Sequence, residues 1–107
     1  MARHQQPALI KAMGVWKALS ENGFRGRTAT ELRIEFDMPK STCWRILKTL
    51  EEGNWVVRKP GGRQREDIWQ ISPSFLEVLA KYRQYMMGRV QGVKDEYRAV
   101  TKEDLEA

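Results

Sequence analysis

Basic and polar side chains recur in the segment 40–49 and again in a short loop at 58–65. At helical spacing, those of the first segment fall on the face opposite its apolar residues. The loop holds four cations and no acid, beside the glycine pair 61–62. Lysine and arginine at this density favour a polyanionic ligand, because they replace the counterions of phosphates. The candidate binding residues are Thr28, Lys40, Ser41, Thr42, Trp44, Arg45, Lys48, Arg58, Lys59, Arg63 and Arg65.

The positive charge is unevenly spread along the chain. The net charge of the 107 residues is +5; residues 1–71 carry 13 Lys/Arg and 8 Asp/Glu, and residues 72–107 carry 6 of each. The whole excess therefore lies in the first two-thirds. Charge alone is also compatible with a soluble basic protein that has no polyanionic partner.

Residue types that support catalysis or metal binding are scarce. The single Cys43 excludes an internal disulfide, and with the single His4 it makes a zinc site of protein ligands improbable. No glycine-rich phosphate loop precedes a Lys-Ser/Thr pair. We therefore expect no enzyme activity, no metal and no cofactor. Lacking a long apolar run and a signal-peptide pattern, the chain is expected in the cytoplasm, associated with the nucleoid.

Three helices are expected before residue 54. The first runs from Pro7 to Asn22, with an apolar stripe that includes Leu9, Ile10, Met13 and Trp16. After a loop at 24–27, a capping box in Thr28-Ala29-Thr30-Glu31 begins the second, which Asp37-Met38-Pro39 ends. The third runs from Pro39 to about Glu52, and its apolar stripe is formed by Cys43, Ile46, Leu47 and Leu50.

A β-hairpin and a long helix follow. The β-branched and aromatic runs 55–57 and 68–71 flank the glycine-containing basic loop, as the two strands of a hairpin would. Ser72 and Pro73 then suit the start of a helix that reaches Arg89 or beyond, weakened at Gly88 and Gly92. The predicted fold is mainly α with a small β-hairpin, a winged helix-turn-helix. We expect a DNA-binding domain at 1–71 and a C-terminal segment at 72–107 with a polar tail.

The segments 28–32, 38–42 and 45–53 resemble the N-terminal DNA-binding domain of IclR-type transcriptional regulators. That family typically shows T-x-x-E-L, a short turn with L-P-K-S-T, and R-L-L-x-T-L before a glycine. The resemblance covers about residues 9–71 and implies that the helix beginning at Pro39 is the recognition helix. The usual Ala-Glu-x-x-Gly-Leu is replaced by residues 33–38, and 107 residues leave no room for the family's effector-binding domain. No small-molecule effector is therefore expected. MarR-type regulators share this topology, so the exact family stays open.

Each candidate has a simpler structural alternative. Arg45 is expected to contact a base or phosphate, or else to pair with Glu52. The first helical turn, 40–42, favours a phosphate or simply caps the helix. Trp44 contacts DNA or packs against the wing, and the wing-tip arginines contact phosphates or pair with Glu66 and Asp67. Cys43 is expected in the core, and the tryptophans at 16, 55 and 69 are expected to be core residues rather than a stacking platform for bases.

A second surface is expected after Ser72, where apolar residues follow spacings of 3 and 4. We expect a homodimer held by Phe75, Leu79, Tyr82, Met86, Val90 and Val93, on a stripe that continues to Tyr97 and Val100; a monomer folded back on the first helix is the alternative. The function expected from the sequence is specific binding of double-stranded DNA in transcription regulation. A protein-binding adaptor, or a replication, packaging or partition factor of a mobile element, is the alternative.

Overall fold

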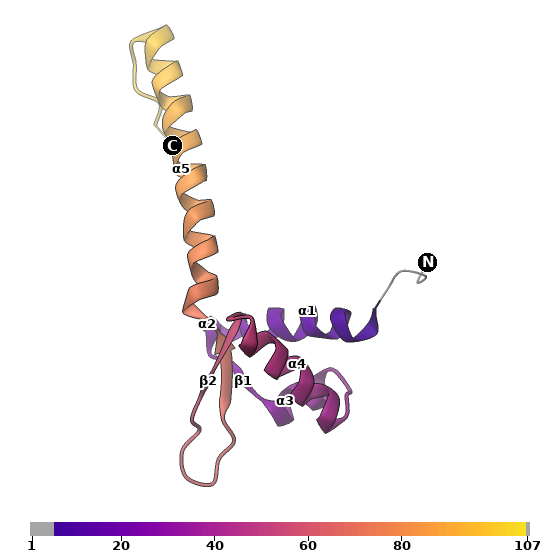
Figure 1. The fold of residues 1–107 in the computed structure, drawn as a ribbon. Helices are drawn as coiled ribbons and strands as arrows, with labels where there is room; N and C mark the ends of the chain where they lie inside the picture. The colour runs from indigo at the N-terminus through magenta and orange to yellow at the C-terminus, as the bar shows by residue number, and fades with distance from the viewer. Residues whose placement is uncertain (1–5, 107) are drawn as a thin grey trace. The chain divides into compact units, whose positions relative to one another are not determined.

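The computed structural model describes residues 6–106, so His4 and the rest of the N-terminal stretch lie outside the described residues. The chain divides into two compact units, Met1–Phe75 and Leu76–Ala107. The elements are α1 (Pro7–Leu19), α2 (Glu21–Phe24), β1 (Arg27–Thr28), α3 (Ala29–Glu35), α4 (Lys40–Glu52), β2 (Val56–Lys59), β3 (Ile68–Ile71) and α5 (Pro73–Thr101). Figure 1 labels all of them except β3. They form the predicted mainly helical winged helix-turn-helix, with one strand more than expected.

The additional strand is β1, which sequence reasoning placed partly in a loop. It pairs antiparallel with β3, Arg27 opposite Trp69 and Thr28 opposite Ile68, so that the sheet order is β1-β3-β2. Gly26 makes this pairing possible: a Cβ there would lie 2.3 Å from the Trp69 carbonyl oxygen, and its φ is +90°. Two residues carry too little periodic signal to be predicted as a strand.

One small core joins the helices to the sheet. Val15 and Leu19 of α1, Leu32 of α3, Leu47 of α4 and Trp69 of β3 are each at most 2% exposed. At about 25 cal/mol per Å² of buried apolar surface, such side chains supply most of the free energy that offsets chain entropy. The core therefore fixes α4 and the sheet relative to one another.

The first helix begins at Pro7 as predicted, but it ends earlier than expected, and part of its predicted core-facing stripe is exposed. It ends at Leu19, because Asn22 and Gly23 take positive φ values of 54° and 73° inside the following turn. Leu9 and Met13, expected on a core-facing stripe, are 54% and 53% exposed. They lie with Trp16, Leu50 and Trp55 along an apolar groove of about 620 Å³ between α1 and the end of α4.

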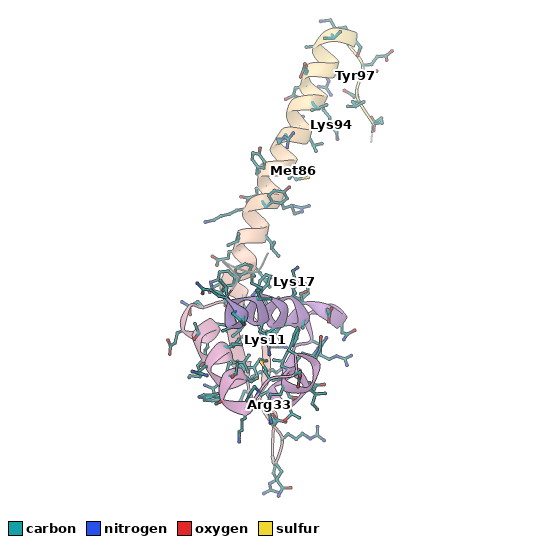
Figure 2. The ribbon with its side chains drawn as sticks, turned by 90° about the vertical axis from the view of Figure 1, so that its right-hand side faces the viewer. Lys11, Lys17, Arg33, Met86, Lys94 and Tyr97 are labelled. Carbon is teal, nitrogen blue, oxygen red and sulfur yellow. The ribbon has the colours of Figure 1, made fainter. Side chains whose placement is uncertain are left out.

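The turn between α3 and α4 is held by α1. A Cβ at Gly14 would lie 2.8 Å from Phe36 Cε1, so the missing side chain lets the Phe36 ring approach the helix. Lys11 Nζ donates a hydrogen bond to the Asp37 carbonyl oxygen at 3.2 Å (Lys11 is labelled in Figure 2). Asp37 has a φ of 47° and Met38 is 5% exposed, so this turn is compact and buried on its inner side.

The wing is the hairpin of β2 and β3 with its connecting loop, and the two strands lie side by side in Figure 1. Val56 pairs with Ile71 and Lys59 with Ile68, which confirms the predicted hairpin. The loop narrows at Gly61, where a Cβ would lie 1.8 Å from the Glu66 carbonyl oxygen. Beyond it, Gly62 has a φ of +95° and nothing within 4 Å of an added Cβ.

The long helix α5 begins as predicted, since the Ser72 hydroxyl accepts a hydrogen bond from the Ser74 amide at 3.1 Å. It continues through Gly88 and Gly92 to Thr101, in agreement with a helix predicted to reach Arg89 or beyond. Within the second unit, Leu105 follows the helix and lies with Met86, Val90 and Val93 around a shallow hollow (Met86 is labelled in Figure 2). No helix among residues 6–106 is both long and apolar enough to cross a membrane.

Candidate nucleic-acid interface

Helix α4 separates its side chains into two faces. Cys43, Ile46 and Leu47 are between 0% and 7% exposed and pack into the core. Lys40, Ser41 and Arg45 lie on the opposite, exposed face. Among residues 6–106, neither Lys40 nor Arg45 has an acidic partner within 4 Å, so the predicted alternative of an Arg45–Glu52 pair is absent there. Two unpaired cations therefore stand on the exposed face of α4.

The first turn of α4 keeps its backbone donors available. The N-cap is Pro39, with a φ of −64° and a ψ of 157°, and no side chain within the described residues caps this helix. The first turn contains no acidic residue. Unpaired amides and the positive end of the helix dipole attract an anion. Ser41 and the half-buried Thr42 are placed next to these amides.

The wing carries the second group of unpaired cations. Lys59, Arg63 and Arg65 are exposed, and none of them lies within 4 Å of an acidic group in the described part of the chain. Glu66, the expected local partner, instead accepts a hydrogen bond from the Thr30 amide at 3.2 Å. The basic tip is therefore free to meet phosphates, while the returning arm of the wing is attached to α3.

Lys48 and Arg58, also predicted to bind DNA, share an acidic partner inside the chain. Glu51 Oε1 accepts from Lys48 Nζ at 2.9 Å and from Arg58 Nη2 at 3.1 Å, and Glu51 Oε2 accepts from Arg58 Nε at 3.3 Å. These hydrogen bonds, that from Lys48 first, lower the pKa of the Glu51 carboxyl below its ordinary value. The two cations are thus partly neutralised where α4 meets β2.

Trp44 packs against the wing, one of the two roles expected for it. Its ring meets that of Trp69 edge to face, with centroids 6.2 Å apart, and remains 49% exposed. The Arg58 guanidinium lies 5.4 Å from the Trp44 ring centre and 4.8 Å from that of Trp69. Contacts within the chain therefore fix the position of Trp44, while about half of the residue stays exposed.

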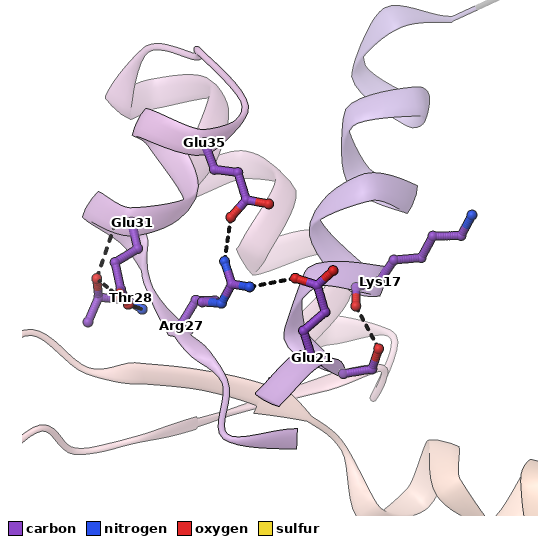
Figure 3. Close-up of polar contacts among 7 residues, drawn as sticks. Lys17, Glu21, Arg27, Thr28, Glu31 and Glu35 are labelled. Carbon is purple, nitrogen blue, oxygen red and sulfur yellow. Dashed lines mark hydrogen bonds and ion pairs between the residues drawn. The ribbon is translucent and has the colours of Figure 1, made fainter. Parts of the chain in front are cut away.

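Thr28 is accounted for by the start of α3 (Figure 3). Its hydroxyl accepts from the Glu31 amide at 3.2 Å, and its amide donates to Glu31 Oε1 at 2.8 Å, which confirms the predicted capping box. The hydrogen bond from the Thr28 amide lowers the pKa of Glu31. The neighbouring Arg27 pairs with Glu21 at 2.6 Å and with Glu35, so it fastens α2 to α3.

The aromatic and cysteine side chains answer two further expectations. Cys43 is 1% exposed, as predicted for a core residue, and burial raises the pKa of its thiol. Trp69 is in the core, but Trp16 is only half-buried and Trp55 is 44% exposed. Trp16, Trp55 and Phe75 pack on one another instead: the ring centre of Phe75 lies 4.5 Å from that of Trp16 and 4.6 Å from that of Trp55. No group of three or more potential metal ligands occurs among residues 6–106.

The sequence interpretation missed the residues that connect these pieces. From the sequence, Glu51 is only a residue near the end of the third helix, and Glu66 is only a local partner for the wing-tip arginines. The spacing of Lys48 and Glu51 is a recognisable helical ion pair. By contrast, Arg58 reaches Glu51 only because the strand folds back along the helix, which no local pattern shows.

These helices and the hairpin define a winged helix-turn-helix domain, and comparison with known proteins supports this class. An IclR transcriptional regulator from Alicyclobacillus acidocaldarius is 30% identical, with a TM-score of 0.62 over 74% of this chain and 30% of that chain. A MarR family transcription regulator is 17% identical, with a TM-score of 0.52 over 88% of this chain and 65% of that chain. A protein from Archaeoglobus fulgidus is 19% identical, with a TM-score of 0.51 over 78% of this chain and 88% of that chain.

Residues 8–60 match the family described as the IclR helix-turn-helix domain. Comparison with curated proteins gave no match. The chain spans 30% of the length of the A. acidocaldarius regulator. The predicted resemblance to IclR-type domains is confirmed, including the segments around the capping box and α4 on which it was based.

Proposed function

We propose that this protein binds specific sequences of double-stranded DNA and thereby regulates transcription, with α4 as the recognition helix. The observation that carries the proposal is the exposed face of α4, where Lys40 and Arg45 have no acidic partner among the described residues. A major groove about 12 Å wide admits one such helix. The match of residues 8–60 to the IclR helix-turn-helix domain supports the same placement.

The exposed groups divide into base-reading and phosphate-binding sets. Arg45, in the middle of the exposed face, has the planar fork that recognises guanine through two hydrogen bonds. Lys40, Ser41 and Thr42 surround free helix-start amides, which suit a phosphate. Lys59, Arg63 and Arg65 belong to a narrow, glycine-containing loop, whose tip is better suited to phosphates than to base edges. We assign Thr28, Lys48 and Arg58 to holding these elements in place.

The direct test is selection of bound duplexes from a random pool, followed by affinity measurements against a scrambled duplex over a range of salt. We expect a preferred sequence and an affinity that falls as salt rises. A winged helix that acts as a protein-binding adaptor instead predicts equal, weak binding to both duplexes. A replication, packaging or partition factor would also show a preferred duplex. Occurrence of the preferred sequence beside promoters would favour transcription regulation over these roles.

Arg45→Ala tests the recognition helix. The variant is expected to lose about 1–3 kcal/mol of discrimination at one base pair, since a bidentate arginine–guanine contact is worth that much. Arg83→Ala, an equal loss of charge at an exposed position of α5, is the matched control. Unchanged affinity of Arg45→Ala for the preferred duplex would remove α4 from the proposed role.

We further propose that the protein is a homodimer held by α5. Leu79, Tyr82, Val90 and Val93 are between 41% and 62% exposed, on a helix of 29 residues that is about 43 Å long. An uncovered apolar stripe of this length favours association. Phe75, included in the predicted interface, packs on Trp16 and Trp55, and Met86 is half-buried. Two half-sites would give the longer palindromic target that a single domain lacks.

Light scattering of the full chain and of the double variant Val90→Glu/Val93→Glu tests this assembly. We expect a dimer for the parent and a monomer for the variant, because two charges would be buried without partners. Ala80→Glu/Gln84→Glu is the matched control, which adds the same two charges at exposed positions of the same helix outside the stripe. A parent monomer at micromolar concentration contradicts the proposal, and a dimer that survives in the variant moves the interface toward α1.

A further inference from the structure

Two parts of the proposed DNA-binding surface meet at Glu51. This residue lies in the last turn of α4, while Arg58 lies in β2, the outgoing arm of the wing. Arg58 directs Nε and Nη2 to the two carboxylate oxygens, at 3.3 and 3.1 Å. A fork-to-fork pair of this kind is strong and strict in geometry. The contact therefore fixes the direction in which the wing leaves the helix.

The same guanidinium is enclosed by aromatic rings. It lies 4.8 Å from the ring centre of Trp69, which is 2% exposed, and 5.4 Å from that of Trp44. Cation–π contacts add to the ion pair, since rings that shield the guanidinium also reduce its solvation. With two of its nitrogens on Glu51 and its side chain 29% exposed, Arg58 has little left to offer a phosphate.

The returning arm of the wing has its own attachment. Glu66 accepts from the Thr30 amide in the first turn of α3, and Gly61 leaves no room for a side chain against the Glu66 carbonyl. One arm is thus joined to α4 and the other to α3. Only the tip beyond Gly61, which holds Arg63 and Arg65, extends past these attachments.

We propose that Glu51 and Arg58 are positioning residues for DNA recognition: together they lock the wing onto α4, so that base contacts by the helix and phosphate contacts by the tip occur in one fixed register. This inference rests on the proposed function. It assigns to Arg58 a role different from the direct contact that its charge suggests, and it gives Glu51 a role although the acid would itself repel DNA.

The variants Glu51→Gln and Arg58→Lys separate the two roles of Arg58. If Arg58 contacts phosphate, Arg58→Lys retains affinity, and Glu51→Gln binds all duplexes more tightly because a repelling charge is gone. If the pair positions the wing, each variant prefers the selected over the scrambled duplex about tenfold less than the parent does. A tenfold change corresponds to the free energy of about one charge-assisted hydrogen bond. The double variant should then lose no more than either single one. Arg25→Lys, the same exchange at an exposed arginine outside both the lock and the proposed DNA-binding surface, is the matched control and should retain the parent's preference.

Amide hydrogen exchange of the full chain without DNA tests the lock itself. Glu51→Gln is expected to speed exchange in residues 56–71, where the ladder of β2 and β3 lies, and to leave the buried part of α4 unchanged. Unchanged exchange in the wing, or a gain in affinity for all duplexes, overturns the inference. This measurement needs no DNA, so it tests the lock independently of the proposed function. A parent protein that binds no duplex would refute the proposed function, and hydrogen exchange would still show whether the lock exists.

Discussion

The wing tip offers a prediction whose size follows from the structure. Arg63 and Arg65 are exposed and have no acidic partner in the described part of the chain, so both are available to displace counterions. Each phosphate contact contributes about 0.9 to the slope of log affinity against log salt. Replacing both arginines by alanine should therefore reduce the slope by about 1.8. Between about 50 and about 200 mM salt, the parent should then lose about twelvefold more affinity than the variant.

Fluorescence anisotropy with the preferred and the scrambled duplex measures this effect. The loss should be the same for both sequences, because phosphates carry no base identity. Lys81→Ala/Arg83→Ala removes the same charge from α5 and is expected to leave the slope nearly unchanged. An unaltered slope in the wing variant, or a loss confined to one duplex, would refute the phosphate-binding role of the tip.

Four further predictions concern the scaffold. Lys48 and Arg58 lower the pKa of the Glu51 carboxyl, so the ion pairs of Glu51 stabilise the fold above about pH 4.5. This stabilisation is lost as the pH falls through the lowered pKa that Glu51 has in the folded protein. Glu51→Gln should thus cost less than about 1 kcal/mol at neutral pH, and denaturant titrations at falling pH should show this difference disappear once Glu51 is protonated in the folded protein. Thr28→Ala should cost about 1 kcal/mol by the same measurement, through loss of the α3 cap, whereas Thr49→Ala on exposed α4 should cost less. Leu47→Ala should cost about 2–5 kcal/mol by opening a cavity in the core, and a cost below 1 kcal/mol would mean that the core repacks. Cys43 should react with a thiol reagent only as the protein unfolds, since it is 1% exposed and its thiol pKa is raised; rapid reaction of the native chain would contradict this.

Local patterns predicted the elements of the fold well. The Thr28–Glu31 capping box, the break before Pro39 and the two apolar runs around Gly61 each act within a few residues, and the structure contains the helix starts and the hairpin that they indicate. The recognition-type helix was likewise readable, because the polar and apolar residues of 40–52 separate at helical spacing.

Contacts between distant segments were not readable in this way. Leu9 and Met13 have core-like spacing but lie exposed, since the body of the domain covers only the later turns of α1. The pairing of β1 with β3 depends on Gly26 meeting a strand more than forty residues away. In the candidate site, charge showed where cations cluster along the chain but not which of them have acidic partners. It could not separate Arg58, which turns inward to Glu51, from Arg63, which does not.

The narrow point at Gly61 has a consequence for how this domain tolerates insertions. Any side chain at that position would collide with the Glu66 carbonyl, whereas Gly62 has open space around it. Extra residues inserted between Gly62 and Arg65 would lengthen the tip without disturbing the paired strands. The same insertion one or two positions earlier would separate the arms from α3 and α4. The length of the wing can thus be changed beyond Gly61 but not before it. Loops of different length could be grafted at the tip while the rest of the domain stays unchanged.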